Sequence, residues 1–292
     1  MPEGKIIKAL SGFYYVLDGE KVIQCRGRGV FRKNKITPLV GDDVVYQADH
    51  DKEGYLLEIK TRVNELVRPP ISNVDQAVLV FSAKEPTFST SLLDRFLVLV
   101  EANDIQPIIC ITKMDLAEDS REQIHQYAED YRNIGYPVYL TSTESGSGME
   151  EVIPHFQDRI TVFAGQSGVG KSSLLNAISP DLKLKTDGIS AHLGRGKHTT
   201  RHVELIHING GLVADTPGFS SLEFTGIEAE NLGYTFLEIG EKSAECKFRG
   251  CLHIKEPNCA VKKAVENGEI ASYRYDHYVE FLTEIKDRKP RY

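Results

Sequence analysis

Residues 160–178 read ITVFAGQSGVGKSSLLNAI, and this stretch decides the fold of the middle of the chain. The strand-type run ITVFA leads into the phosphate-loop pattern GxxxxGK[ST], and a helical pattern follows it. Glycines let backbone N–H groups turn toward phosphate oxygens, and the helix directs the positive end of its dipole at the same anion. We therefore predict a nucleotide site formed by consecutive residues: Gly165, Gln166, Ser167, Gly168, Val169, Gly170, Lys171, Ser172 and Ser173.

Two residues of this loop are expected to carry chemistry of their own. Lys171 would reach the β- and γ-phosphates, and Ser172 would ligate the Mg²⁺ that accompanies the nucleotide. A phosphate loop does not show which base is bound, so the base must be read elsewhere in the chain.

The base-reading pattern is Thr112-Lys113-Met114-Asp115, at the end of the apolar run PIICIT. The Asp115 carboxylate can accept hydrogen bonds from the N1–H and N2–H₂ groups of guanine, a donor pair that adenine lacks. Lys113 would lay its alkyl stem along the base, while Thr112 stands where asparagine is commonest in the NKxD pattern. Four letters alone are weak evidence, because a solvated charge pair at a strand end has the same sequence. A phosphate loop in the same domain supports the interpretation of residues 112–115 as the guanine-binding motif.

Two further loops follow strand-type runs. Thr141-Ser142 closes the run PVYLT, at the place where a GTPase loop touches the guanine O6 through a backbone N–H. Asp215-Thr216-Pro217-Gly218 closes the run GLVAD and has the DxxG pattern. We expect Asp215 to hold Mg²⁺ through water and the Gly218 N–H to face the γ-phosphate.

The residue after this glycine is Phe219, where a GTPase usually has its catalytic glutamine. Another group must therefore position the hydrolytic water. The basic, glycine-rich segment LGRGKHTTRH lies at the place of switch I, where Thr199 and Thr200 are candidates to cap Mg²⁺ and the γ-phosphate. His198 could orient the water, because a neutral imidazole with a pKa near ~6.5 is suited to that role; a plain surface histidine is the alternative.

A separate cluster of metal-binding side chains lies near the C-terminus. The pattern is Cys246-x4-Cys251-x-His253-x5-Cys259, whereas Cys25 and Cys110 lie in apolar runs. Three thiolates and one imidazole complete a tetrahedral zinc site with no open position. We predict one structural Zn²⁺ in a segment with too few aliphatic residues for a large core of its own.

The order of the motifs is unusual. In an ordinary small GTPase the phosphate loop comes first, but here residues 112–115 precede residues 165–173, which precede residues 198–200 and 215–218. The sequence therefore predicts a circularly permuted P-loop GTPase domain. The loop at 215–218 would then lead directly into the C-terminal segment.

The predicted fold is multidomain α/β, since 292 residues suffice for two to three domains. Residues 1–68 show short alternating segments typical of a β-barrel, of the oligonucleotide-binding (OB) type or of the SH3-like type. Arg68-Pro69-Pro70 is expected to be a stiff, extended boundary. Residues 71–225 alternate apolar strands with helical patterns, which predicts a mainly parallel sheet, and residues 226–292 are expected to form a small zinc domain ending in a helix.

Composition limits the partners and the location. A net charge of −7 argues against a general nucleic-acid coat, yet residues 26–35 carry Arg26, Arg28, Arg32, Lys33 and Lys35 without an acid. No run approaches the ~20 apolar residues of a membrane-spanning helix, and the first residues lack a signal pattern. We expect a cytoplasmic protein that does not bind membranes.

Together, the barrel, the permuted GTPase motifs and the Cys-x4-Cys-x-His-x5-Cys pattern resemble the ribosome small-subunit-dependent GTPase A family, over nearly the whole chain. The resemblance implies a monomeric GTPase of late 30S subunit maturation that binds GTP and GDP, contacts rRNA and is stimulated by the small subunit. It also supports Phe219 as the replacement for glutamine and His198 as the water-positioning residue.

Two other functions remain compatible with the motifs. A P-loop ATPase or kinase would leave residues 112–115 without a role. An RNA-binding module could hold its nucleotide as a static ligand without turnover.

Overall fold

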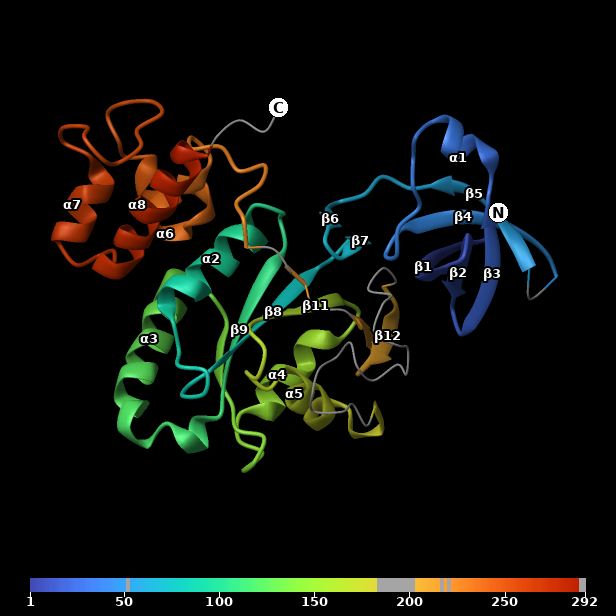
Figure 1. Cartoon of the computed structure of the whole chain (residues 1–292), viewed down its shortest axis with the longest axis horizontal. Helices are drawn as coiled ribbons and strands as arrows, with labels where there is room; N and C mark the ends of the chain where they lie inside the picture. Colours follow the sequence, from blue (N-terminus) through green and yellow to red (C-terminus); the bar gives the residue numbers. More distant parts are fainter. Residues whose placement is uncertain (51–52, 183–202, 216–217, 220–221, 289–292) are drawn as a thin grey trace.

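The computed structural model describes residues 1–50, 53–182, 203–215, 218–219 and 222–288 of the chain. Figure 1 shows three neighbouring parts: a barrel at the N-terminus, a central sheet flanked by helices, and a helical C-terminal part. The N-terminal barrel and the C-terminal helices lie on different sides of the central sheet (Figure 1).

The N-terminal barrel is closed by five strands in the order β1-β2-β3-β5-β4. All its neighbouring strands are antiparallel except β3 and β5, which run parallel. This Greek-key order, with a short helix between β3 and β4, agrees with the OB-type barrel. The elements are β1 (Glu3–Leu10), β2 (Phe13–Asp18), β3 (Lys21–Gly27), α1 (Gly29–Lys33), β4 (Asp43–His50) and β5 (Glu53–Ile59).

The prediction of an extended boundary at residues 68–70 is wrong. Strands β6 (Glu65–Val67) and β7 (Pro70–Ser72) pair as an antiparallel hairpin, and residues 68–69 form its turn. Leu66 and Ile71 are buried, and Ile71 also forms a bridge with Val40 of the barrel segment. Burial of these two side chains favours a folded hairpin over an extended linker, so the barrel passes to the sheet through packed structure.

The central sheet has the strand order β10-β9-β8-β11-β13-β12. Only β12 at one edge is antiparallel to its neighbour, which confirms the mainly parallel sheet. The strands are β8 (Gln76–Ser82), β9 (Gln106–Thr112), β10 (Val138–Leu140), β11 (Ile160–Ala164), β12 (Leu205–Ile208) and β13 (Gly211–Ala214).

Helices cover both faces of this sheet. Ala77, Leu79 and Phe81 of β8 belong to the core cluster that includes α2 and α3, whereas Val78 and Val80 belong to the cluster that includes α4 and α5. This alternation follows from the two-residue period of a strand. The helices are α2 (Thr90–Glu101), α3 (Arg121–Ile134), α4 (Met149–Val152) and α5 (Lys171–Ile178), with short 3₁₀ helices at Met114–Leu116, Glu118–Ser120, Ile153–Phe156 and Pro180–Leu182.

The strand order also shows the permutation in space. Strand β11, which carries the phosphate loop, pairs in parallel with β8 from the earlier part of the chain and with β13 from the later part. The predicted base-reading strand β9 lies on the β8 side, and the DxxG strand β13 lies on the other. The strands that carry the predicted motifs thus form one sheet, although the strand predicted to bind the base precedes the phosphate-loop strand in the sequence.

The C-terminal part is helical and packs directly on the central domain. Its helices are α6 (Leu237–Ser243), α7 (Ala260–Glu266) and α8 (Ser272–Asp287), with a 3₁₀ helix at Leu232–Thr235. The aromatic residues Phe236, Tyr278 and Phe281 are buried and belong to the same core cluster as α2 of the central domain. Aromatic side chains and a shared interface therefore supply the core that the few aliphatic residues could not.

A buried ion-pair network joins α8 to α2. Arg274 is 1% exposed, and its guanidinium donates to Asp94 at 2.5 Å and to Glu238 at 2.6 Å. Asp94 is fully buried and also accepts from Tyr131 and pairs with His277. Removing one partner of such a pair leaves a buried charge without compensation, so this network fixes α8 against the central domain.

Candidate functional site

The phosphate loop lies between β11 and α5, as the sequence predicted. Gly165, Gly168 and Gly170 all have positive φ, and a Cβ at Gly165 would lie 2.1 Å from the carbonyl oxygen of Val80. Only glycine can therefore occupy position 165 without moving the neighbouring strand β8. Helix α5 begins at Lys171, so its first N–H groups face the loop.

Lys171 folds back over this loop. Its Nζ donates to the carbonyl oxygens of Gly165 at 2.8 Å and Gln166 at 2.6 Å. Burial lowers the pKa of Lys171. Ser172 follows in the first turn of α5 and is buried.

The residues predicted to bind the base lie directly beside the phosphate loop. The Thr112 hydroxyl lies 2.6 Å from Val169 O and 3.1 Å from Phe81 O, and the Lys113 ammonium donates to Gly168 O at 2.8 Å. Thr112 therefore ties the end of β9 to the phosphate loop through its side chain. This contact explains how threonine serves at the position where asparagine is commonest.

Asp115 lies in the 3₁₀ turn after β9 and accepts a hydrogen bond from the Ser142 hydroxyl. The segments after β9 and β10 thus meet at one edge of the sheet, where the carboxyl ends of parallel strands gather. Met114 is buried and packs in the core rather than facing this edge.

The loop at Thr141-Ser142 was expected to contact guanine O6 through a backbone N–H, and the N–H of Ser142 is engaged within the loop. This N–H donates to Ser147 O at 3.1 Å, and the Ser142 side chain is engaged with Asp115. Thr143 is the next residue, it is exposed, and within the described part of the chain its N–H has no hydrogen-bond partner. The sequence does not show which N–H groups of this loop are engaged, because the backbone geometry alone determines it.

Asp215 lies immediately after β13. Its Oδ1 accepts from the N–H of Glu204 at 2.9 Å, and its own N–H donates to Glu204 O at 2.9 Å. The Gly218 N–H, which the sequence predicted to face the γ-phosphate, donates to Phe163 O at 2.7 Å. A Cβ at Gly218 would lie 3.2 Å from Val162, which shows how closely this loop packs on β11.

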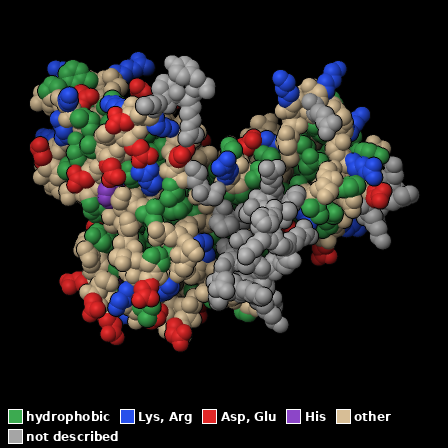
Figure 2. Space-filling model, viewed as in Figure 1, with side chains coloured by type: hydrophobic (Ala, Val, Ile, Leu, Met, Phe, Trp, Pro, Cys, Tyr) green, Lys and Arg blue, Asp and Glu red, His purple; other side chains and the backbone are tan. Residues whose placement is uncertain are grey.

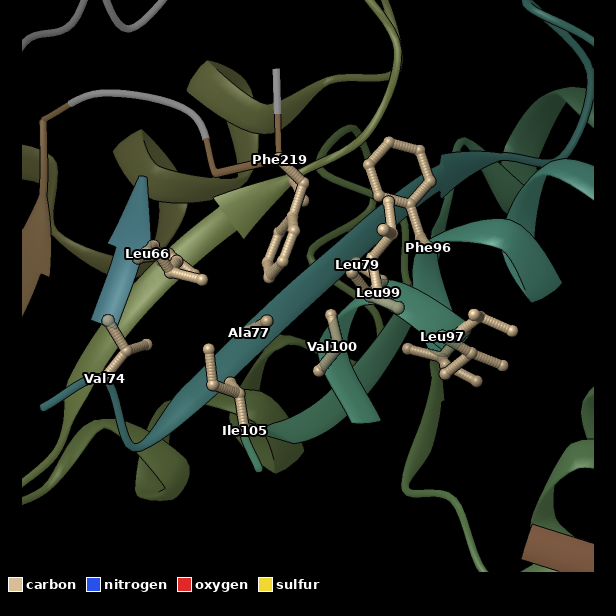
Figure 3. Packing of buried hydrophobic residues seen from close by; sticks show 14 of the residues in the cluster. Leu66, Val74, Ala77, Leu79, Phe96, Leu97, Leu99, Val100, Ile105 and Phe219 are labelled. Carbon is tan, nitrogen blue, oxygen red and sulfur yellow. The ribbon is translucent and has the colours of Figure 1, made fainter. Parts of the chain in front are cut away.

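Phe219 is buried and points into the apolar cluster, beside Leu66 and Leu79 (Figure 3). Its side chain is thus part of the core, so another residue must orient a hydrolytic water. The predicted candidates His198, Thr199 and Thr200 lie outside the described residues.

The cysteine and histidine side chains near the C-terminus converge as a metal site would require. The ligand atoms of Cys246, Cys251, His253 and Cys259 all lie within 4.8 Å of one another. The Sγ of Cys259 lies 3.8 Å from that of Cys246 and 3.9 Å from that of Cys251. A tetrahedral Zn²⁺ with Zn–S distances of about 2.3 Å places its sulfurs about 3.8 Å apart, so these residues fit zinc.

The imidazole of His253 is oriented for ligation. The Ser243 hydroxyl donates to Ile239 O at 2.6 Å, so it accepts from the Nε2–H of His253 at 2.9 Å. The lone pair of Nδ1 is then directed at the cysteines, 3.3 Å from Cys259 Sγ. In zinc sites, a hydrogen bond from the ring nitrogen that does not bind the metal commonly fixes the tautomer of the histidine.

Comparison with known families decides the identity. Residues 59–225 match the RsgA GTPase family, and residues 3–56 match the RsgA N-terminal domain. The chain belongs to the RsgA GTPase family. As an RsgA GTPase it hydrolyses GTP, which leaves the alternative of a P-loop ATPase without support.

Individual RsgA relatives cover the whole chain. A protein of Bacillus subtilis (strain 168) named small ribosomal subunit biogenesis GTPase RsgA is 78% identical over the full length of both chains. The crystal structure of YloQ, described as a circularly permuted GTPase, superposes with a TM-score of 0.87 at 73% identity and covers 100% of this chain and 97% of that one. YjeQ from Thermotoga maritima superposes with a TM-score of 0.88 at 41% identity over 99% of both chains.

Two features of the site had no signal in the sequence. The carbonyl oxygen of Glu85 accepts from Lys113. The N–H of Glu204 donates to the Asp215 side chain, and the Glu204 carbonyl accepts from the Asp215 N–H. Glu85 and Glu204 make these contacts with their backbone atoms, which any residue type supplies. No helix within the described residues has the length and apolar character needed to cross a membrane.

Proposed function

We propose that this RsgA-family GTPase couples GTP hydrolysis to late maturation of the small (30S) ribosomal subunit. The observation that carries the proposal is the hydrogen bond from Thr112 to Val169, which holds a base-reading edge against a phosphate loop. The name of the Bacillus subtilis relative, identical at 78% of positions, supports the small subunit as the partner.

In this proposal the guanine edge and the phosphates are bound by separate groups. Asp115, held by Ser142, reads the N1–H and N2–H₂ groups, and the exposed Thr143 N–H takes the O6 contact expected of the Ser142 loop. Residues 165–173 surround the phosphates, with Lys171 as a catalytic residue at the β- and γ-phosphates. Gly218 contacts the γ-phosphate only after its N–H leaves Phe163 O.

We assign Mg²⁺ to three oxygen ligands and the orientation of the attacking water to a histidine of the switch segment. Ser172, Asp215 and Thr200 would hold Mg²⁺, since hydroxyl and carboxylate oxygens are the ligands that this ion prefers. The ion would neutralise charge developing on the phosphates. His198 orients the attacking water, because Phe219 is buried away from it.

The flanking parts are proposed to bind the subunit, with limits near 1–68 for the barrel, 71–225 for the GTPase domain and 226–292 for the zinc part. The residues 26, 28, 33 and 35 are exposed, and Figure 2 shows Lys and Arg side chains over the end of the barrel that carries α1. Such a surface suits rRNA phosphates. We further propose that the chain acts as a cytoplasmic monomer.

Co-sedimentation with purified ribosomal subunits tests the partner. The chain should sediment with small subunits in a non-hydrolysable GTP analogue, less in GDP, and not with large subunits. Equal sedimentation with both subunits would contradict the assignment.

Replacing Arg28, Arg32 and Lys33 together by glutamine should weaken small-subunit binding. Each phosphate contact releases counterions, so the slope of log affinity against log salt should fall by about two to three. GTP affinity should stay unchanged. Lys84→Gln, which removes an exposed charge from the central domain, is the control, and an unaltered salt slope in the triple variant would argue against an RNA-binding role.

Cys251→Ser should abolish stoichiometric zinc and lower Tm by about 5 °C or more, because the metal contributes to folding. GTP affinity should persist, since the phosphate loop lies in another part of the core. Metal analysis of the purified chain and thermal unfolding provide the measurements, with Cys25→Ala as the control outside the cluster. Parent protein purified without chelators and free of zinc would disprove the site.

A further inference from the structure

Strand β1 of the barrel contacts the edge of the central sheet near β12. Lys8 of β1 and Glu204, next to β12, form an antiparallel backbone bridge. Their side chains form an ion pair, with Lys8 Nζ 2.7 Å from Glu204 Oε2. Both side chains are partly shielded from solvent, at 25% and 32% exposure, so the pair is screened less than one on an open surface.

The same glutamate determines the direction of the Asp215 carboxylate. The N–H of Glu204 donates to Asp215 Oδ1, and the Glu204 carbonyl accepts from the N–H of Asp215, both at 2.9 Å. The second of these bonds joins two backbone groups just beyond the last β12–β13 pair, Leu205 with Ala214, and the first joins a backbone N–H to the Asp215 side chain. Asp215 is thereby held by a residue whose own side chain is tied to the barrel.

We propose that Glu204, anchored by Lys8 of the barrel, is a positioning residue for Asp215 and so sets the affinity of the site for Mg²⁺. The inference rests on the proposed role of Asp215 as a ligand of that ion through water. The Glu204 N–H fixes the position of Oδ1 of Asp215. Because the carboxylate is rigid and planar, this contact also restricts where Oδ2 can point. The barrel then contributes to the ion site through Glu204.

A regulatory consequence follows from the arrangement. The basic end of the barrel, at α1, is separate from the β1 edge that meets β12 (Figure 1). A partner can therefore hold the barrel by its basic end while β1 remains in contact with Glu204. Displacement of the barrel by that partner would act on Asp215 through the Lys8–Glu204 pair.

The test uses the full chain with charge reversals at both ends of the pair. Lys8→Glu and Glu204→Lys each place like charges opposite one another, and the double variant restores opposite charges. The first readout is equilibrium affinity for fluorescent GDP across a Mg²⁺ titration, which needs no turnover. The second is the Mg²⁺ concentration that gives half-maximal GTP hydrolysis.

Each single variant should raise the Mg²⁺ concentration needed for half-maximal GDP binding and GTP hydrolysis by about tenfold. Loss of a supporting contact to a metal ligand commonly has an effect of this size. The double variant should return this concentration to within about threefold of the parent. Lys60→Glu reverses an exposed charge that pairs with Glu3 of the same barrel, and it should leave the Mg²⁺ requirement unchanged. Lys8→Gln provides a milder variant should Lys8→Glu disturb folding.

Asp215→Asn separates the two levels of the proposal. If Asp215→Asn raises the Mg²⁺ requirement but Lys8→Glu, Lys8→Gln and Glu204→Lys do not, the positioning role is wrong and the ion ligand stands. Failure of the double variant to rescue would also overturn the role. If Asp215→Asn has no effect, the ion assignment itself is wrong, and the inference falls with it.

Discussion

His198→Ala should lower small-subunit-stimulated GTP turnover by about 100-fold or more while leaving nucleotide and subunit binding intact. The expectation follows from Phe219, whose buried side chain occupies the chain position after the DxxG glycine without offering a polar group. The basic segment at the place of switch I contains His198, a polar candidate for this role. Loss of the imidazole should then affect the chemical step alone.

Single-turnover phosphate release from GTP on purified small subunits measures this effect, with GTP affinity determined separately. His125→Ala removes an exposed histidine from α3 and serves as the matched control. A His198→Ala variant that hydrolyses GTP at the parent rate while bound would remove His198 from this role. Thr199, Thr200 or an rRNA group would become the next candidate.

Asp115→Asn should change the preferred base from guanine to xanthine, with GTP affinity reduced by about 100-fold or more. An amide can donate to the additional carbonyl of xanthine, whereas it cannot accept from both guanine donors. The Ser142 hydroxyl can still donate to the amide oxygen, so the loop should keep its arrangement.

Competition between GTP and xanthosine triphosphate for the purified variant measures the change. Asp119→Asn, which neutralises an exposed carboxylate a few residues further on, should keep the preference for GTP. An unchanged base preference in Asp115→Asn would show that another group reads the ring.

The elements with a strong local pattern could be predicted from the sequence. The strand-type run ITVFA corresponds to β11 (Ile160–Ala164), and the run GLVAD contains β13 (Gly211–Ala214). Continuous apolar runs of this kind are typical of strands covered on both faces. The convergence of Cys246, Cys251, His253 and Cys259 likewise followed from residue types that have few other reasons to gather.

The features that escaped prediction depend on tertiary contacts. The turn at residues 68–69 belongs to a hairpin because Leu66 and Ile71 find a buried environment that no local pattern reveals. The C-terminal part shares a core with α2 because a buried arginine, Arg274, bridges Asp94 and Glu238 from distant segments. The hydrogen bonds of the Gly218 and Ser142 N–H groups depend on backbone direction, which residue type does not determine.

The most direct test of the account is phosphate release from GTP by the purified chain alone, with small subunits and with large subunits. The account predicts slow release alone, a rise of about tenfold or more with small subunits, and no rise with large subunits. Equal release in the three mixtures, or stimulation by large subunits, would contradict it.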